Sequence, residues 1–320
     1  MRLSAVLATK NSAPPRTRCL LSYHSKQVFA TLLRQKKEEK AAFPLGEGRN
    51  QAKIFVWDLD LPPTGGCIKG AYNREEESAV LTISHYTKTY PGGKTAVDDL
   101  TLHVSPGEIC GFIGRNGAGK TTTLRAVAGV MDFTQGTISI GGRDIRREPV
   151  AAKSITAFLP DNPDLYEFMS GIQYLNLVAD LYAIPAQQRE ERIRLYGGSF
   201  SLTADLGGAI AGYSHGMKQK LAVLSALIHK PKLLLLDEPF VGLDPAAALM
   251  LKDIMRKICA DGGAIFFSTH VLDVAEKLCN KVAIIKEGRL VAAGDMEKLV
   301  KPGASLEELF MEVANRAETD

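Results

Sequence analysis

The sequence has no hydrophobic run that is long enough to cross a membrane as a helix. Such a helix needs about 18 or more consecutive apolar residues, whereas the densest apolar stretches, at 221–228 and 233–236, have the length of core elements. The composition is otherwise that of a globular protein, with 45% hydrophobic residues in a chain of 320. We therefore expect a chain that folds around a buried core and does not span a membrane by itself.

Cysteine is scarce and irregularly placed. Disulfide frameworks use cysteines in pairs, and structural zinc sites use closely spaced cysteines such as CxxC. Here the number is odd and no CxxC spacing occurs, so we expect reduced thiols in a cytosolic protein. The five cysteines are Cys19, Cys67, Cys110, Cys259 and Cys279.

Most of the chain also lacks an excess of basic residues. The net charge is +3, but residues 1–78 hold 13 Lys and Arg against 8 Asp and Glu, whereas residues 79–320 hold 26 against 28. Nucleic-acid binding normally requires a basic surface on the folded domain. We therefore expect no nucleic-acid partner.

Residues 1–78 differ from the rest of the chain in sequence pattern and composition. They show no sustained helical or strand periodicity, and residues 61–66 are rich in turn-forming proline and glycine. The first 37 residues carry eight basic residues and no acidic one, which is the composition of an organellar transit peptide. We favour a flexible N-terminal extension without a role in the fold.

From residue 79 onward, apolar β-branched runs alternate with segments of helical length. This alternation predicts an α/β fold around a parallel sheet whose strands are buried on both faces. Between about 162 and 221 the strand-like runs stop and a helical pattern takes over, which predicts a helical subdomain inserted between two halves of the sheet. The expected strands are 79–84, 108–114, 154–159, 233–237, 264–268 and 281–285, and the expected helices are 171–182, 186–196 and 215–228.

Residues 114–121 read Gly-Arg-Asn-Gly-Ala-Gly-Lys-Thr and match the P-loop pattern G-x-x-x-x-G-K-[ST]. A strand-like run precedes the motif and a helical run follows it, as a phosphate-binding loop requires. Glycines let backbone N–H groups surround a phosphate, the helix N-terminus adds its positive end, and the lysine adds a cation. The Thr121 hydroxyl is placed to bind Mg²⁺. We expect ATP to contact Gly114, Asn116, Gly117, Gly119, Lys120, Thr121 and Thr122.

A second motif, Leu-Leu-Leu-Leu-Asp-Glu-Pro at residues 233–239, ends a buried strand in two carboxylates. Nucleotide sites of open parallel sheets lie at the carboxyl ends of the strands. We expect Asp237 to hold Mg²⁺, and Glu238 to act as the general base for the water that attacks the γ-phosphate.

Between the two motifs, residues 213–219 read Tyr-Ser-His-Gly-Met-Lys-Gln at the start of a helical segment. A small hydroxyl and a glycine at a helix start form an end that can bind an anion. This motif resembles the signature of ATP-binding-cassette (ABC) ATPases, and the order of the motifs is similar to that family over residues 79 to about 316. The resemblance implies that Ser214 and Gly216 contact ATP held by a second, opposed subunit.

The resemblance also implies a P-loop parallel-sheet core with an N-terminal antiparallel β part, and roles for further residues. Tyr90 resembles the aromatic residue that stacks on adenine, and His270 resembles the switch histidine at the γ-phosphate. Residues 242–245 look like the loop that crosses the dimer interface. His215 and Met217 stand where glycine and glutamine are commonest, a variation associated with export-type subunits.

Asp161 stands where the family usually has glutamine, at the junction with the helical insert. The resemblance places this position near Mg²⁺ and the attacking water. Aspartate is shorter than glutamine and is normally charged, so two interpretations remain open. Asp161 either reports the state of the site to a partner, or faces solvent and caps the helical insert.

The leading functional hypothesis is an ATP-binding and ATP-hydrolysing subunit of an ABC transporter, in particular an exporter. Its expected partners are a separate polytopic membrane protein and a second ATPase subunit, on the inner face of the cell membrane. A non-transport ABC ATPase acting on ribosomes or DNA is the alternative. Such relatives usually carry two cassettes, long coiled coils or zinc motifs. A nucleotide sensor without turnover would lack a general base, yet Glu238 is present.

Overall fold

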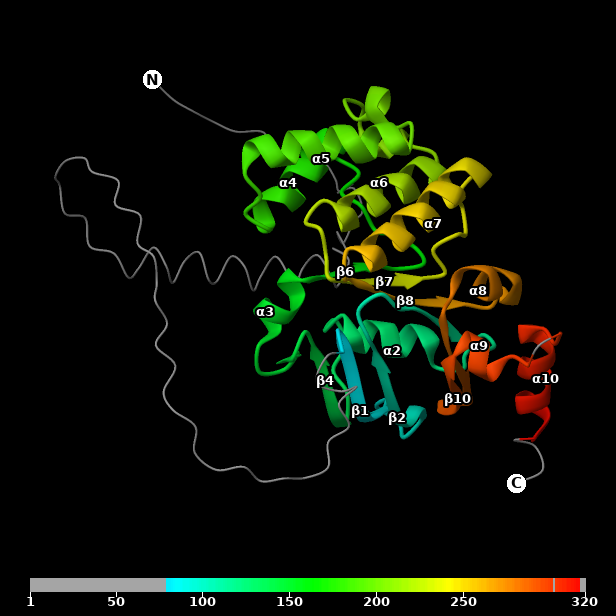
Figure 1. Ribbon diagram of the computed structural model, residues 1–320. Coiled ribbons are helices and arrows are strands. Elements are labelled where there is room, and N and C mark those ends of the chain that lie inside the picture. The colour runs from blue at the N-terminus through cyan, green and yellow to red at the C-terminus, as the bar shows by residue number, and fades with distance from the viewer. Residues whose placement is uncertain (1–78, 302, 317–320) are drawn as a thin grey trace, which may run out of the picture.

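The computed structural model of the protein describes residues 79–301 and 303–316, which Figure 1 draws as ribbons. The predicted N-terminal extension, residues 1–78, lies outside the described residues. Its boundary with the cassette at residue 79 therefore stays a prediction.

The first sheet is antiparallel and has four strands in the order β2-β1-β4-β5. Register shifts interrupt the pairing of β1 with both of its neighbours. Such irregularities break the alternation of apolar and polar residues by which strands are recognised. This explains why the sequence pattern predicted only a short strand here. The strands are β1 (Leu81–Thr89), β2 (Thr95–Val104), β4 (Gln135–Ile140) and β5 (Arg143–Asp144).

The second sheet has six strands in the order β10-β9-β3-β8-β7-β6. All neighbours in it pair in parallel except the edge strand β10, which runs antiparallel to β9. Strands β3, β6, β7 and β8 are buried along their whole length, as continuous apolar runs predict. The strands are β3 (Ile109–Ile113), β6 (Thr156–Leu159), β7 (Leu233–Asp237), β8 (Ala264–Thr269), β9 (Lys281–Lys286) and β10 (Arg289–Asp295).

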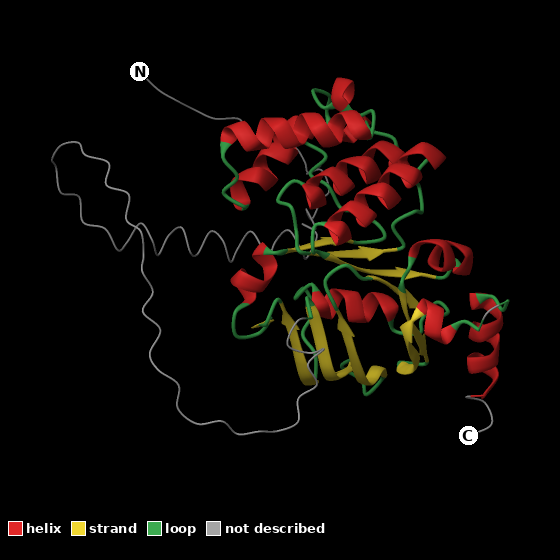
Figure 2. Cartoon of the chain, viewed as in Figure 1, coloured by secondary structure: helices red, strands yellow, loops and turns green. Residues whose placement is uncertain are grey.

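Helices cover both faces of this six-stranded sheet (Figure 2). No helix in the described part of the chain is both long enough and apolar enough to cross a bilayer. The helices are α2 (Lys120–Val127), α3 (Pro149–Ser154), α4 (Gly171–Leu181), α5 (Ala186–Ser199), α6 (His215–Leu227), α7 (Pro245–Ala260), α8 (Leu272–Leu278), α9 (Met296–Leu299) and α10 (Leu306–Arg316), with 3₁₀ turns at Thr203–Asp205 and Ile210–Gly212.

The three helices predicted between residues 162 and 228 are present as α4, α5 and α6, and each begins at the predicted residue. Local chemistry sets the start of α4. The Ser170 hydroxyl accepts a hydrogen bond from the Gln173 amide (3.3 Å), and the Gln173 side chain accepts one from the Ser170 amide (2.9 Å). This capping box satisfies two amides that would otherwise lack partners at the helix start.

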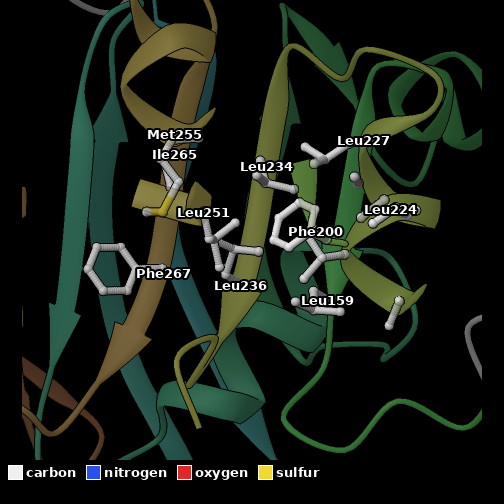
Figure 3. Packing of buried hydrophobic residues seen from close by; sticks show 14 of the residues in the cluster. Leu159, Phe200, Leu224, Leu227, Leu234, Leu236, Leu251, Met255, Ile265 and Phe267 are labelled. Atoms are coloured by element: carbon white, nitrogen blue, oxygen red, sulfur yellow. The ribbon is translucent and has the colours of Figure 1, made fainter. Parts of the chain in front are cut away.

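The parallel sheet separates two buried clusters, because successive side chains of a strand point to opposite faces. Along β8, Ile265 and Phe267 belong to the cluster shared with α6 and α7, whereas Phe266 belongs to the cluster shared with α2 and the antiparallel sheet. Figure 3 shows the first cluster filling the space between the strands and the helices, with Leu224 of α6 and Leu251 of α7 among its members. Together the layers confirm the predicted α/β class with a parallel core and an antiparallel β part.

Replacing Phe267 by alanine tests this packing. The side chain is fully buried and packs edge-on against Phe240, with ring centroids 6.2 Å apart. Phe267→Ala should lower the free energy of unfolding by about 3–5 kcal/mol in urea titrations. The control Leu195→Ala removes a side chain that is 55% exposed and should change it by about 0.5 kcal/mol or less. Equal losses in the two variants would contradict the described core.

Candidate nucleotide-binding and hydrolytic site

The register of three parallel strands brings the two main motifs together. Ile113 at the end of β3 lies opposite Thr269 of β8, and Asp237 at the end of β7 lies opposite Ser268 of β8. The carboxyl ends of β3, β8 and β7 therefore stand at the same level. The residues that follow them, Gly114, His270 and Glu238, leave the sheet at one edge.

The glycine-rich loop owes its shape to three glycines with different constraints. A Cβ on Gly114 would lie 2.5 Å from the Ile285 carbonyl oxygen, so only glycine fits against β9. Gly117 has a φ of 84° in open space, and Gly119 has a φ of 112°. Side chains other than glycine are strained in this left-handed region. Gly119 is the N-cap of α2, so the loop ends at a helix N-terminus, which favours anions.

Lys120 is buried, although its side chain is charged. Its Nζ donates to the carbonyl oxygens of Gly114 (2.7 Å) and Arg115 (3.3 Å) and lies 3.9 Å from Glu238 Oε1. Burial lowers the pKa of Lys120, while the carboxylates of Glu238 and Asp237 raise it in part. The ammonium thus sits inside the loop, between backbone acceptors and the carboxylate at the end of β7.

Asp237 is buried at the end of β7, and its two carboxylate oxygens differ in their hydrogen bonding. The Ser268 hydroxyl donates to its Oδ1, whereas its Oδ2 accepts no hydrogen bond from the described residues. Burial raises the pKa of Asp237, the Ser268 and Thr121 hydroxyls lower it in part, and the charges of Asp161 and Glu238 raise it further. A buried carboxylate oxygen without a donor is a favourable ligand for a cation.

A cation at this place would need ligands beyond carboxylates. Among the described residues, no group of three or more His, Cys, Asp or Glu side chains could hold a metal ion. P-loop proteins complete the magnesium site with a threonine hydroxyl and phosphate oxygens. Thr121 and Asp237 fit that donor set.

Glu238 is held in an unusual backbone conformation. Its φ is 48°, and its amide donates to both the carbonyl oxygen (3.3 Å) and the hydroxyl (3.2 Å) of Ser268. A non-glycine residue in this region is strained, and the two acceptors offset part of the cost. The carboxylate Oε1 lies 2.8 Å from Nδ1 of His270, whose side chain is 53% exposed. The strained backbone of Glu238 thus holds its carboxylate beside His270.

Tyr90 lies beside the start of α2. Its hydroxyl is 3.3 Å from the Thr122 hydroxyl and 3.6 Å from Met131 Sδ, and the Lys88 ammonium lies 5.2 Å from the ring centroid. The side chain of Tyr90 therefore lies against Thr122, the residue that follows the phosphate loop. Asn116, at the tip of the loop, is exposed.

Two of the predicted residues lie apart from this group. Ser214 is the exposed N-cap of α6, where its hydroxyl accepts from the Met217 amide at 3.3 Å. Gly216 faces Gly242, since a Cβ on Gly216 would lie 3.2 Å from the Gly242 carbonyl oxygen. No hydrogen bond or ion pair within the described part of the chain joins Ser214 to the glycine-rich loop. The start of α6 is thus an open helix end.

Asp161 follows β6 and is exposed. The interpretation that it caps the helical insert is wrong, because Ser170 is the N-cap of α4. Its charge acts on the buried carboxylate of Asp237, whose pKa it raises. Asp161 thus lies between the end of β6 and the first helix of the helical part, α4.

Two features of the site were not predicted from the sequence. Ser268 binds both Asp237 and Glu238, and its position just before Thr269-His270 was the only signal that the sequence offered. Lys220 of α6 lies 2.6 Å from the carboxylate of Asp244, the N-cap of α7. No sequence pattern joins these two, because the contact links separate segments.

Comparisons with known proteins show the family of this chain. A family model described as "ABC transporter" matches residues 97–241. The ABC-type transporter ATP-binding protein EcsA of Bacillus subtilis is 33% identical over 233 residues, which cover 71% of this chain and 94% of that protein. The Nod factor export ATP-binding protein I of Paraburkholderia xenovorans is 33% identical over 234 residues, which cover 72% of this chain and 77% of that protein.

A solved structure of the ATP binding subunit of an ABC transporter is 34% identical, with a TM-score of 0.71. It covers 73% of this chain and 99% of its own. By sequence and by fold, this chain belongs to the ATP-binding subunits of ABC transporters.

Proposed function

We propose that this subunit binds ATP with Mg²⁺, hydrolyses it, and powers an exporter whose membrane-spanning part is a separate polypeptide. The observation that carries the proposal is the cluster at the ends of β3, β7 and β8. It places the Lys120 ammonium 3.9 Å from Glu238 Oε1, and His270 Nδ1 2.8 Å from the same oxygen. A lysine that can bind phosphate, a candidate base and a histidine thus share one edge of the sheet.

The chemistry follows from the charges at this edge. ATP phosphates would lie in the glycine-rich loop, where the buried Lys120 and the N-terminus of α2 offset their charge. Glu238 accepts a proton from the attacking water while the water oxygen bonds to the γ-phosphorus. The bond from the γ-phosphorus to the bridging oxygen breaks, which leaves ADP and phosphate. His270 holds the Glu238 carboxylate in place through its Nδ1.

The residues at the buried end of the site fit a magnesium ion. Thr121 and Asp237 would hold it, with Asp161 beside them, and the ion would withdraw charge from the phosphate oxygens. The unpartnered Oδ2 of Asp237 supports this assignment.

The open end of α6 supports a dimer of two such subunits. Ser214 and Gly216 lie at the N-terminus of a 13-residue helix, whose first turn holds no acidic residue. Because ATP of the same subunit would lie in the glycine-rich loop, we propose that this end contacts the γ-phosphate of ATP in a second subunit. ATP would then be bound between two copies, or between this chain and a related one.

A surface beside Asp161 suits a membrane partner. Phe168 is 79% exposed and lies next to Tyr166, with ring centroids 5.8 Å apart. A pocket between β6, α4 and α6 adjoins this aromatic pair. Exposed apolar side chains around a pocket are typical of protein interfaces. We propose that an apolar segment of the transporter binds here, which would hold the subunit on the inner face of the cell membrane. The export relative supports the direction of transport.

Glu238→Gln and Lys120→Ala test the assignment of turnover. The amide of Glu238→Gln keeps the shape of the side chain but cannot accept the proton, so phosphate release should fall by about 10²–10⁴-fold while ATP binding is kept. Lys120→Ala should weaken ATP binding, measured by calorimetry, because it removes the cation. The control Glu190→Gln changes an exposed glutamate of α5 and should have no effect. Near-normal hydrolysis by Glu238→Gln would place the base elsewhere.

The composite site predicts dimerisation that depends on ATP. In the Glu238→Gln background, ATP should accumulate and hold two subunits together, which light scattering reports as a doubled mass. Adding Gly216→Asp places a negative charge against the γ-phosphate and should abolish that dimer. If the Glu238→Gln protein stays monomeric at saturating Mg-ATP, the isolated subunit does not form the proposed dimer.

Asp161→Ala tests the link between the site and the membrane partner. Its charge reaches Asp237, yet it lies outside the loop that would hold the phosphates. The variant should bind ATP like the parent and lose most of the stimulation of hydrolysis by the copurified membrane protein in lipid. Asp205→Ala, an exposed aspartate of the helical part, is the matched control. Equal stimulation of Asp161→Ala and its parent would exclude a coupling role.

A further inference from the structure

The loop between β7 and α7, residues 238–244, lies directly against the start of α6. A Cβ on Gly242 would lie 2.7 Å from Nε2 and 2.8 Å from Cδ2 of His215, the first residue of α6. The edge of the imidazole therefore rests on the α-carbon of Gly242. The φ of Gly242 is 81°, so both the conformation and the contact require glycine.

Two further contacts join the same elements. Gly216 faces the Gly242 carbonyl oxygen, since a Cβ on Gly216 would lie 3.2 Å from it. Lys220 Nζ lies 2.6 Å from Asp244 Oδ2, and this hydrogen bond lowers the pKa of the Asp244 carboxyl. The first turn and a half of α6 thus contacts the loop at Gly242 and again at Asp244.

The loop itself begins at the candidate base. The Val241 amide donates to the Glu238 carbonyl oxygen at 3.2 Å, and the Leu243 amide donates to the Phe240 carbonyl oxygen at 3.4 Å. These tight turns make the loop a short, stiff connection from Glu238 to Gly242. A displacement at Gly242 is therefore transmitted along the backbone to Glu238.

We infer that His215 is a positioning residue that couples two ATP sites. On one side, the helix end that begins at Ser214 and His215 would contact ATP of the second subunit. On the other side, the imidazole supports the loop that carries Glu238 of its own subunit. Filling one site thus sets the geometry of the base in the other. The inference rests on the proposed function, because it requires hydrolysis by a dimer.

The test compares His215→Ala with Lys218→Ala in the full-length protein, with Mg-ATP as the only ligand. Lys218 is the control because it lies in the same helical turn but pairs with Glu167 instead of the loop. His215→Ala should lower kcat by about 3- to 30-fold and bring the Hill coefficient for ATP close to one, with KM changed by about twofold or less. Lys218→Ala should match the parent in all three quantities.

His215→Gln gives a conservative rescue, because its amide can still reach Gly242. It should retain more of the parent kcat than His215→Ala, with an unchanged melting temperature in both variants. A double-mutant cycle with Gly242→Ala tests the contact itself. The new Cβ of Gly242→Ala collides with the imidazole of His215, and this collision is absent when His215→Ala is also present. The loss of kcat in the double variant should therefore be smaller than the product of the losses in the two single variants.

The possible results distinguish a failure of the His215 inference from a failure of the proposed function. His215→Ala with the parent kcat and Hill coefficient would overturn the inference. So would a raised KM with an unchanged kcat, since it would mean that the imidazole binds ATP directly. If the loss of kcat in the double variant equals the product of the two single losses, the contact between His215 and Gly242 does not affect turnover, and the inference is wrong. A parent protein that neither hydrolyses ATP nor dimerises would instead overturn the proposed function, and this inference with it.

Discussion

The parallel pairing of β3, β8 and β7 is the constraint on which the rest of the site depends. Its register sets Ile113 opposite Thr269, and Asp237 opposite Ser268. A slip of one residue would exchange the side chains of β8 between the two buried clusters, because side chains alternate along a strand. The glycine-rich loop, the carboxylates and His270 meet because three short apolar strands end at the same level.

This arrangement buries the charged side chains of Lys120 and Asp237, and contacts within the site offset part of the free-energy cost. Desolvation disfavours both the Lys120 ammonium and the Asp237 carboxylate, which shifts their pKa values toward the neutral forms. Each charge lowers the cost of burying the other, and Ser268 supplies a hydrogen bond. One acceptor, Oδ2 of Asp237, still lacks a donor. The described site is therefore electrostatically incomplete, and anionic phosphates with a divalent cation would complete it.

The sequence predicted the features that are formed by residues close together in the chain, and it missed those formed by distant segments. The phosphate loop and the acidic strand end are contiguous motifs, and the helices α4 to α6 follow from periodicity and caps. Ser268 was not assigned, since its contact with Asp237 spans 31 residues and depends on strand register. The antiparallel sheet was underpredicted because its register shifts disturb the alternation. For Asp161, only the structure could exclude capping, by showing that Ser170 caps α4.

The contact between α6 and the loop after β7 gives the fold a property that neither motif has alone. Ser214 and Glu238 belong to different ATP sites of the proposed dimer, yet in one chain they are joined by His215, Gly242 and a few tightly turned residues. In the proposed dimer, a movement of the helix end at Ser214 would therefore displace the loop that carries Glu238. Rigid elements with two alternative arrangements are what energetic coupling between sites requires. The short loop 238–244 would have to be such an element, and the ion pair of Lys220 with Asp244 fixes its far end.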